Sequence, residues 1–161
     1  MSPLRSLQCV VVLLVPSVSL AAQRPDTVSA ADLVVAGISM QTDTDAVRRK
    51  LGSPTNIERP DSTGPYREFV IWSYPSLKVT FDSGVCDAVE ILDSSISTKR
   101  GARVGDPRAR ITRLYGTPEK AAETAMLYML SRGPSELRGV FFVLESGKVT
   151  SIIIGNVLLP D

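Results

Sequence analysis

The sequence contains no histidine among its 161 residues. Histidine is the commonest general base and a frequent metal ligand in enzymes. Its absence excludes Ser-His-Asp and Cys-His catalytic groups and histidine-bearing zinc sites in their usual forms. We therefore expect no catalytic residues, no cofactor and no metal site, and we expect that the protein is not an enzyme.

Long apolar runs are also absent, except for a short one near the N-terminus. There Arg5 precedes an apolar stretch, a break at Pro16 and a series of small residues. This order is typical of a secretory signal peptide, and the run is too short to span a bilayer. We predict that residues 1–22 are a signal peptide, cleaved near Ala21 or Ala22, and that the protein is exported to the periplasm or outside the cell. An uncleaved N-terminal anchor is the alternative.

Cysteine is scarce, with two residues in the chain. Cys9 falls within the predicted signal peptide, which leaves Cys86 as the only thiol of the mature protein. An intrachain disulfide is therefore excluded, although the compartment is oxidising. Cys86 is either a buried, unreactive thiol or the site of a bridge between chains.

Neither sign of charge is in excess. The chain has 18 Lys and Arg against 17 Asp and Glu, and one of the basic residues is Arg5 in the predicted signal peptide. A balanced chain has no basic patch of the kind that binds nucleic acid or an anionic membrane surface. We expect no nucleic-acid partner and, after signal cleavage, no integral membrane span.

A helix pattern occurs twice, at residues 37–54 and 101–118, with no gap in the alignment. In each copy a residue that can cap a helix, Thr42 or Asp106, precedes two apolar residues four positions apart. Gly52 or Gly116 then ends the pattern and is followed two residues later by proline. Each copy predicts a helix of about nine or ten residues closed by a glycine with positive φ. The alternative is that the likeness arose by chance.

Strand patterns follow both helices, and each set contains a Ser-Gly turn, at residues 82–84 and 145–147. The predicted strands cover residues 66–74, 77–81, 85–92, 125–130, 137–144 and 148–155. We predict an α+β protein with two tandem helix-plus-antiparallel-strand repeats that share one antiparallel sheet, with the helices packed on one face. The predicted organisation is a linker at 23–35, a single domain at 36–155 with repeats at 36–96 and 97–155, and a tail at 156–161.

Three stretches resemble a known group of proteins: "GISMQTDTDAVRRKLGSP", "WSYPSLKVTFDSGVCDAVEI" and "RGARVGDPRARITRLYGTP". They are similar to the β-lactamase-inhibitor-protein-like superfamily in its tandem two-repeat form. That superfamily includes the SmpA/OmlA-type lipoproteins of the outer-membrane β-barrel assembly machinery. The resemblance covers residues 36–155 and implies the fold together with a role in envelope assembly or inhibition.

This chain departs from the superfamily in two respects. The inhibitor proteins typically carry a disulfide in each half, and this chain cannot form one. The assembly lipoproteins usually have one copy and a lipidated cysteine, and this chain has neither feature. The resemblance therefore implies the fold more strongly than the partner, because one fold serves many functions.

Three aromatic residues are candidate contacts with another protein: Trp72, Tyr74 and Tyr128. Alternation places Trp72 and Tyr74 on one face of their strand. If the helices cover the face of Phe69 and Ile71, these rings are exposed and can serve as binding anchors. If the helices cover the other face, Trp72 is a core residue, and alternation alone does not decide between the two.

Two other features have alternative interpretations. The run Ile152–Ile154 and the pair Phe141–Phe142 are apolar on both faces, which fits either a central covered strand or an exposed patch that binds a partner. Four acidic residues lie near the first predicted hairpin, and we interpret them as solvated surface residues: Asp82, Asp87, Glu90 and Asp93.

The sequence therefore predicts an exported, non-catalytic protein-binding module whose partner is another envelope or secreted protein. One alternative is a structural homo-oligomer of the cell envelope, formed through the strands of the second copy. The other is a hydrolase that uses carboxylates alone.

Overall fold

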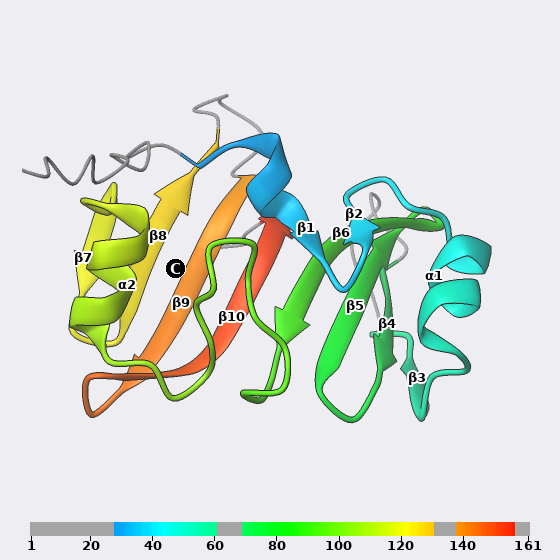
Figure 1. Ribbon diagram of the computed structural model, residues 1–161. Helices are drawn as coiled ribbons and strands as arrows, with labels where there is room; N and C mark the ends of the chain where they lie inside the picture. The colour runs from blue at the N-terminus through cyan, green and yellow to red at the C-terminus, as the bar shows by residue number, and fades with distance from the viewer. Residues whose placement is uncertain (1–27, 61–68, 131–137, 157–161) are drawn as a thin grey trace, which may run out of the picture.

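The computed structural model describes residues 28–60, 69–130 and 138–156 (Figure 1). The predicted signal peptide and all of the predicted tail except Asn156 lie outside these residues. The first part of the chain forms η1 (Ala30–Leu33), β1 (Val34–Val35), β2 (Ile38–Ser39), α1 (Thr44–Leu51), β3 (Asn56–Glu58), β4 (Phe69–Ser73), β5 (Leu77–Asp82) and β6 (Val85–Ile91). The second part forms α2 (Arg108–Tyr115), β7 (Lys120–Ala122), β8 (Ala125–Met129), β9 (Arg138–Glu145) and β10 (Lys148–Asn156).

Eight of the strands form one antiparallel sheet in the order β3-β4-β5-β6-β10-β9-β8-β7, and β1 and β2 form a small second sheet. The two parts of the chain meet where β6 pairs with β10. In that pair Ile91 lies opposite Ile152, and Ala88 lies opposite Gly155. The last described strand, β10, is therefore central in the sheet, and the edges of the described sheet are the three-residue strands β3 and β7.

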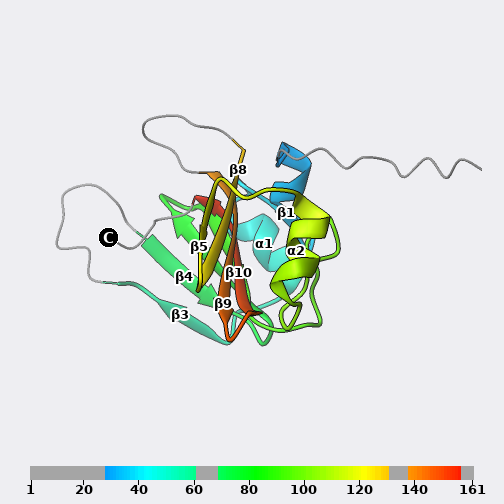
Figure 2. The same ribbon diagram turned by 90° about the vertical axis from the view of Figure 1, so that its left-hand side faces the viewer.

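The predicted fold class is wrong, because the described protein is mostly β. Its two α-helices have eight residues each and lie at opposite ends of the large sheet (Figure 1). A helix of that length extends about 12 Å, whereas eight strands extend about 34 Å across a sheet. The helices therefore cannot form a layer over the sheet. η1, the small sheet and the connection at residues 92–107 lie on the same side between them (Figures 1 and 2).

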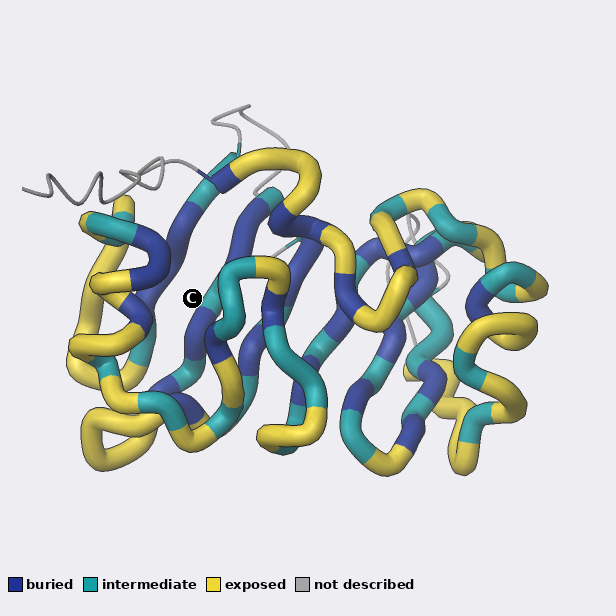
Figure 3. Tube along the Cα trace, in the orientation of Figure 1, coloured by how far each residue is buried: buried dark blue, intermediate teal, exposed yellow. Residues whose placement is uncertain are grey.

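The core lies on the side of the large sheet where these elements pack, which we call the inner face (Figure 3). Alternate residues of each strand point to it. In β5 they are Leu77, Val79 and Phe81, and their neighbours Lys78 and Thr80 are only partly buried. The strict alternation of "LKVTFD" thus becomes one buried and one more exposed face, as expected of a sheet covered on one side.

The glycines that end the helices have the predicted positive φ. Gly52 has φ 81° and Gly116 has φ 82°, with ψ near the extended value in both cases. This region of the backbone map is accessible essentially only to glycine. The predicted caps at the helix starts are wrong by one residue. Asp43, not Thr42, caps α1 by accepting a hydrogen bond from the Ala46 N–H, and Pro107 occupies the equivalent position of α2.

Both Ser-Gly turns were predicted correctly. Ser83 and Gly84 connect β5 to β6, and Ser146 and Gly147 connect β9 to β10. All four residues have positive φ, between 51° and 83°. Two consecutive residues with positive φ are the signature of the tight turn whose twist matches that of the adjoining strands.

Part of the predicted linker belongs to the packed structure. Leu33 and Val35 are buried, and so is the carboxylate of Asp32. Arg100 binds that carboxylate through two hydrogen bonds of 2.8 and 2.9 Å, and its guanidinium lies 4.8 Å from the centre of the Tyr115 ring. Burial acts to raise the pKa of Asp32, but hydrogen bonds from Arg100 and Ser29 outweigh it and hold the pKa below its usual value.

Candidate binding surface

The second side of the large sheet, which we call the outer face, carries the alternate side chains that point away from the core. Ile71, Thr80 and Ala88 lie in register across β4, β5 and β6, and Glu90 lies opposite Ile153 of β10. Figure 2 shows the described helices on the opposite side of the sheet. Within the described residues, no helix covers the outer face.

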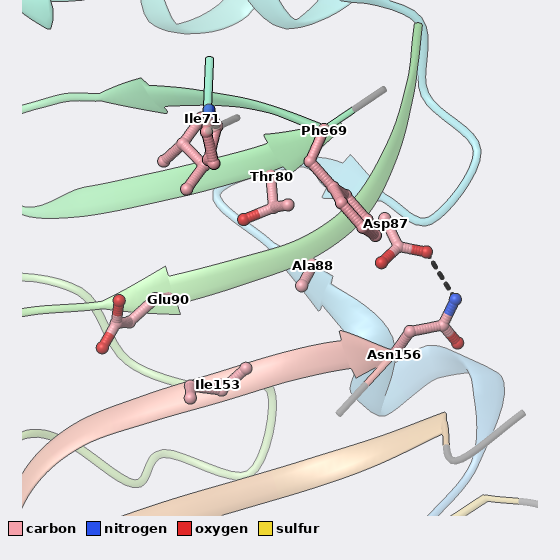
Figure 4. A pocket seen from close by; sticks show the side chains of 9 residues that line it. Phe69, Ile71, Thr80, Asp87, Ala88, Glu90, Ile153 and Asn156 are labelled. Carbon is pink, nitrogen blue, oxygen red and sulfur yellow. Dashed lines mark hydrogen bonds between the residues drawn. The ribbon is translucent and has the colours of Figure 1, made fainter. Parts of the chain in front are cut away.

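A hollow of about 310 Å³ lies on the outer face over β4, β5, β6 and β10, and we call it the outer hollow (Figure 4). Its lining consists of Pro60, Phe69, Ile71, Thr80, Asp87, Ala88, Glu90, Ile153 and Asn156. Apolar side chains dominate, and the acidic groups come from β6. This composition is typical of a site that binds an apolar group and orients it with a few polar contacts.

The polar end of the outer hollow is held in place by side-chain hydrogen bonds. The Asn156 amide donates to the carboxylate of Asp87 (Figure 4), and Arg138 Nε donates to the Asn156 side-chain oxygen at 3.3 Å. Asp87 is 9% exposed, so its interpretation as a solvated residue is wrong. It lies at an irregularity in the pairing of β5 with β6, where Thr80 pairs with Ala88 but Phe81 pairs with Cys86. Asp87 is therefore an extra residue of β6 in its register with β5, and this extra residue interrupts the in-and-out alternation of β6. As a result, the consecutive residues Asp87 and Ala88 both line the outer hollow.

Cys86 precedes Asp87 and is fully buried on the inner face. Burial raises the pKa of its thiol to about 12, and the negative charge of Asp87 acts in the same direction. Such a thiol is protonated at neutral pH and is a poor nucleophile. A bridge between chains at Cys86 is incompatible with this fold, because its sulfur does not reach the surface.

The three predicted contact residues are all buried. Trp72 is 6% exposed, Tyr74 9% and Tyr128 1%. Trp72 packs edge-on against Phe81 with ring centres 4.8 Å apart, and the hydroxyl groups of Tyr74 and Tyr128 donate to the Gly52 and Gly116 carbonyls. Of the two alternatives for Trp72, the structure shows the core position, and none of the three rings lies on an open face. The face of Phe69 and Ile71 is the open one.

A signal in the sequence could have decided between the two faces. Pro75 and Ser76 form a two-residue connection, closed by a hydrogen bond from the Tyr74 N–H to the Leu77 carbonyl. A connection of that length places Trp72 directly opposite Val79. Because Val79 belongs to the apolar side of a strictly alternating strand, Trp72 must share the buried face. The short turn and the alternation together identify the core face.

The two apolar runs of the second part divide between the faces. Ile152, Ile154 and Phe142 are fully buried in the core, whereas Ile153 and Phe141 lie on the outer face and are partly exposed. Phe141 also lines a second hollow beside edge strand β7, of about 610 Å³. The lining of this second hollow is Glu119, Lys120, Ala121, Ala122, Ala125, Leu127 and Phe141.

Within the described ranges, no three His, Cys, Asp or Glu side chains are grouped so that they could hold a metal ion. The described helices also lack the length and apolar character needed to cross a membrane. The outer face offers apolar area, fixed polar groups and carboxylates, which are suited to binding.

Comparison with known proteins identifies no family: no family model and no curated protein matches the chain. Among solved structures, an extracellular protein containing a SCP domain from Bacillus anthracis str. Ames aligns with 89% of this chain at 8% identity and a TM-score of 0.44. The chain covers 50% of that protein. At this TM-score the likeness assigns neither fold nor function. The resemblance to the β-lactamase-inhibitor-protein-like superfamily stays a prediction.

Proposed function

We propose that this protein is a non-catalytic protein-binding module that holds its partner on the outer face of the large sheet. The observation that carries the proposal is the outer hollow, with its apolar floor of Phe69, Ile71 and Ile153. The signal-like N-terminal segment supports export, and the superfamily resemblance supports a partner from the envelope or the secreted proteins.

The energetics of burial favour such a role. The floor residues are partly exposed, so a partner's side chain that fills the hollow removes their apolar surface from water. Each 100 Å² of apolar area buried in this way contributes about 2.5 kcal/mol before the entropic cost of association. The hydrogen bonds from Arg138 through Asn156 to Asp87 keep the polar end in place, which reduces the ordering that binding requires.

The test is a substitution in the hollow with a matched control. Ile71→Asp introduces a charge on the hollow floor, whereas Ile57→Asp introduces the same charge on adjacent strand β3. Ile57 lies opposite Trp72, so it faces the inner side, and it is 40% exposed. We expect Ile71→Asp to lower the amount of partner captured from an envelope extract at least about tenfold, a loss typical of a central contact residue.

The Ile57→Asp variant should capture the partner as the unmodified protein does, and circular dichroism should show both variants folded. Equal capture by the two variants would place the binding surface elsewhere. Hydrolytic activity that depends on Asp87 or Glu90 would contradict the non-catalytic assignment.

A further inference from the structure

A row of five side chains crosses the outer face in register, and we call it the outer row. It consists of Lys120, Leu127, Phe141, Ile153 and Glu90, on β7, β8, β9, β10 and β6 respectively. Each residue lies directly opposite the next on the neighbouring strand, so all five point to the same side of the sheet. The row begins at the sheet edge and ends at the outer hollow, which Glu90 and Ile153 also line.

The two ends of the outer row carry opposite charges, and its middle is apolar. Glu90 is partly buried and Lys120 is exposed, and neither side chain makes a hydrogen bond or ion pair with another described residue. Lys78 lies opposite Glu90 on β5, one strand beyond the end of the row. Phe141 is at the centre, with two residues of the row on each side.

Such a row is complementary to itself when it is reversed. Two sheets that face each other are related by a twofold axis in the plane between them, and an axis over Phe141 that runs parallel to the strands reverses the row. It therefore brings Glu90 of each copy toward Lys120 of the other, and the partly exposed Phe141 and Ile153 meet in the middle. Contacts of this self-complementary kind are the commonest way in which homodimers form.

We propose that a second copy of this chain docks face to face on the outer row, about a twofold axis at Phe141. This arrangement satisfies both isolated charges at once, whereas a partner of a single charge sign would leave one end unpaired. In the dimer Glu90 lies between Lys78 of its own chain and Lys120 of the second copy. Opposite charges across an interface determine orientation and register more than they determine affinity.

The residues beside the row permit two sheets to approach. Ala125 and Val143 lie opposite each other on one side of the row, and Met129 and Gly139 on the other. Gly155 lies opposite Gly139 and has no side chain to project. Packed sheets lie about 10 Å apart with strands crossing at about 30°, and a surface of small and apolar residues fits that separation.

The dimer goes beyond the proposed function and is compatible with it. The overlap covers β6 to β7, because the axis lies at β9 with two strands on each side. Phe69, Ile71 and Thr80 lie on β4 and β5, outside the overlap. Ile153 and Glu90, which also line the outer hollow, are covered by the second copy, so each hollow stays accessible from the side of Phe69, Ile71 and Thr80.

The test is a charge exchange measured as molar mass by light scattering and sedimentation equilibrium on the whole mature protein. The unmodified protein should be a dimer that dissociates on dilution and more readily in high salt. Glu90→Lys and Lys120→Glu should each weaken dimerisation at least about tenfold, because each places like charges opposite each other at both ends of the interface. Mixing the two variants should restore a dimer of one copy of each, because opposite charges then face each other again.

Phe141→Asp should also yield a monomer, and Lys99→Glu is the control, since it changes an exposed lysine on the inner side of the molecule. Circular dichroism identifies any variant that fails to fold. If Phe141→Asp fails to fold, the two charge variants still test the proposal.

A protein that is monomeric at every soluble concentration overturns the inference, as does a mixture of the two charge variants that fails to dimerise. If a monomeric protein still loses its partner on Ile71→Asp, the inference fails while the proposed function stands. If it has no Ile71-dependent partner, both fail.

Discussion

In the first half of the chain, residues 36–96, α1 buries one side chain, Val47, whereas α2 in the second half, residues 97–155, buries Ile111, Leu114 and Tyr115. The two helices have the same length and end at glycines with nearly identical φ. The glycine that ends a helix is therefore independent of how much core the helix contributes. That amount depends on which side chains occupy its inward positions.

The two halves also differ in how many aromatic rings they pack together in the core. In the described part of the first half, Trp72 packs against Phe81, and Arg48 lies 5.0 Å from the centre of the Trp72 ring at the surface. The second half has a cluster of Tyr115, Tyr128 and Phe142, with ring centres 5.1 to 5.9 Å apart. Ring pairs of this geometry contribute about 0.5–1.5 kcal/mol each beyond the area that they bury. We expect the second half to contribute more to stability.

The largest effect should come from truncation of equivalent helix residues. Tyr115→Ala removes a fully buried ring, its contacts with two other rings and its 2.8 Å hydrogen bond to Thr98. We expect a loss of about 3–5 kcal/mol in the free energy of unfolding. Leu51→Ala at the matching end of α1 removes a partly buried side chain and should cost about 1–2 kcal/mol. Urea denaturation measures both, and equal losses would show that the halves contribute equally.

Intermediate and equal effects are expected at the helix ends. Gly52→Val and Gly116→Val each force a β-branched residue into the same positive-φ conformation, so each should cost about 1–3 kcal/mol. At Gly52 this loss is backbone strain alone, because an added Cβ would meet no atom within 4 Å. Ser53→Val is the control, since Ser53 has no positive φ. Thermal denaturation that shows one glycine variant near neutral would break the equivalence of the two ends.

The smallest effect should come from the tyrosine hydroxyls. Tyr128→Phe and Tyr74→Phe remove hydrogen bonds of 3.2 and 3.4 Å to the carbonyls of Gly116 and Gly52. Tyr128 is the more deeply buried, so its carbonyl partner is the less able to bond with water. We expect losses of about 1 kcal/mol for Tyr128→Phe and about 0.5 kcal/mol for Tyr74→Phe. Guanidinium titrations of the two variants, compared with the unmodified protein, give the difference. The reverse order would indicate that burial does not decide the size of the loss.

The parts of the fold that were predictable are those with local causes. The Ser-Gly turns, the glycine ends of both helices and six strands follow from turn chemistry and alternation. The missed strands β1, β2, β3 and β7 have two or three residues each, too few for a pattern to appear. Residues 28–35 were assigned to a linker because nothing in them shows that Asp32 binds Arg100, which lies 68 residues away.

The candidate site was predictable in composition but not in position. The aromatic and apolar residues of β4, β9 and β10 indicated that these strands could contact a partner. The candidate contacts Trp72, Tyr74 and Tyr128, however, belong to the core. Ile71 and Glu90, the residues that now define the outer hollow and the outer row, carry no signal of their own. Their role depends on the pairing of β6 with β10, between residues about 60 positions apart.

By itself, the sequence determined where this backbone turns and where its helices stop, because positive φ at Gly52, Gly84 and Gly116 depends on a glycine's own lack of a side chain. Only the tertiary structure decided which elements cover the buried face and that β6 pairs with β10, because these contacts join residues far apart in the sequence. Here η1, the small sheet and the connection at 92–107 complete the inner layer that two short helices could not form. Trp72 and Tyr128 thereby became core residues, and Ile71, Phe141 and Ile153 stayed partly exposed on the outer face.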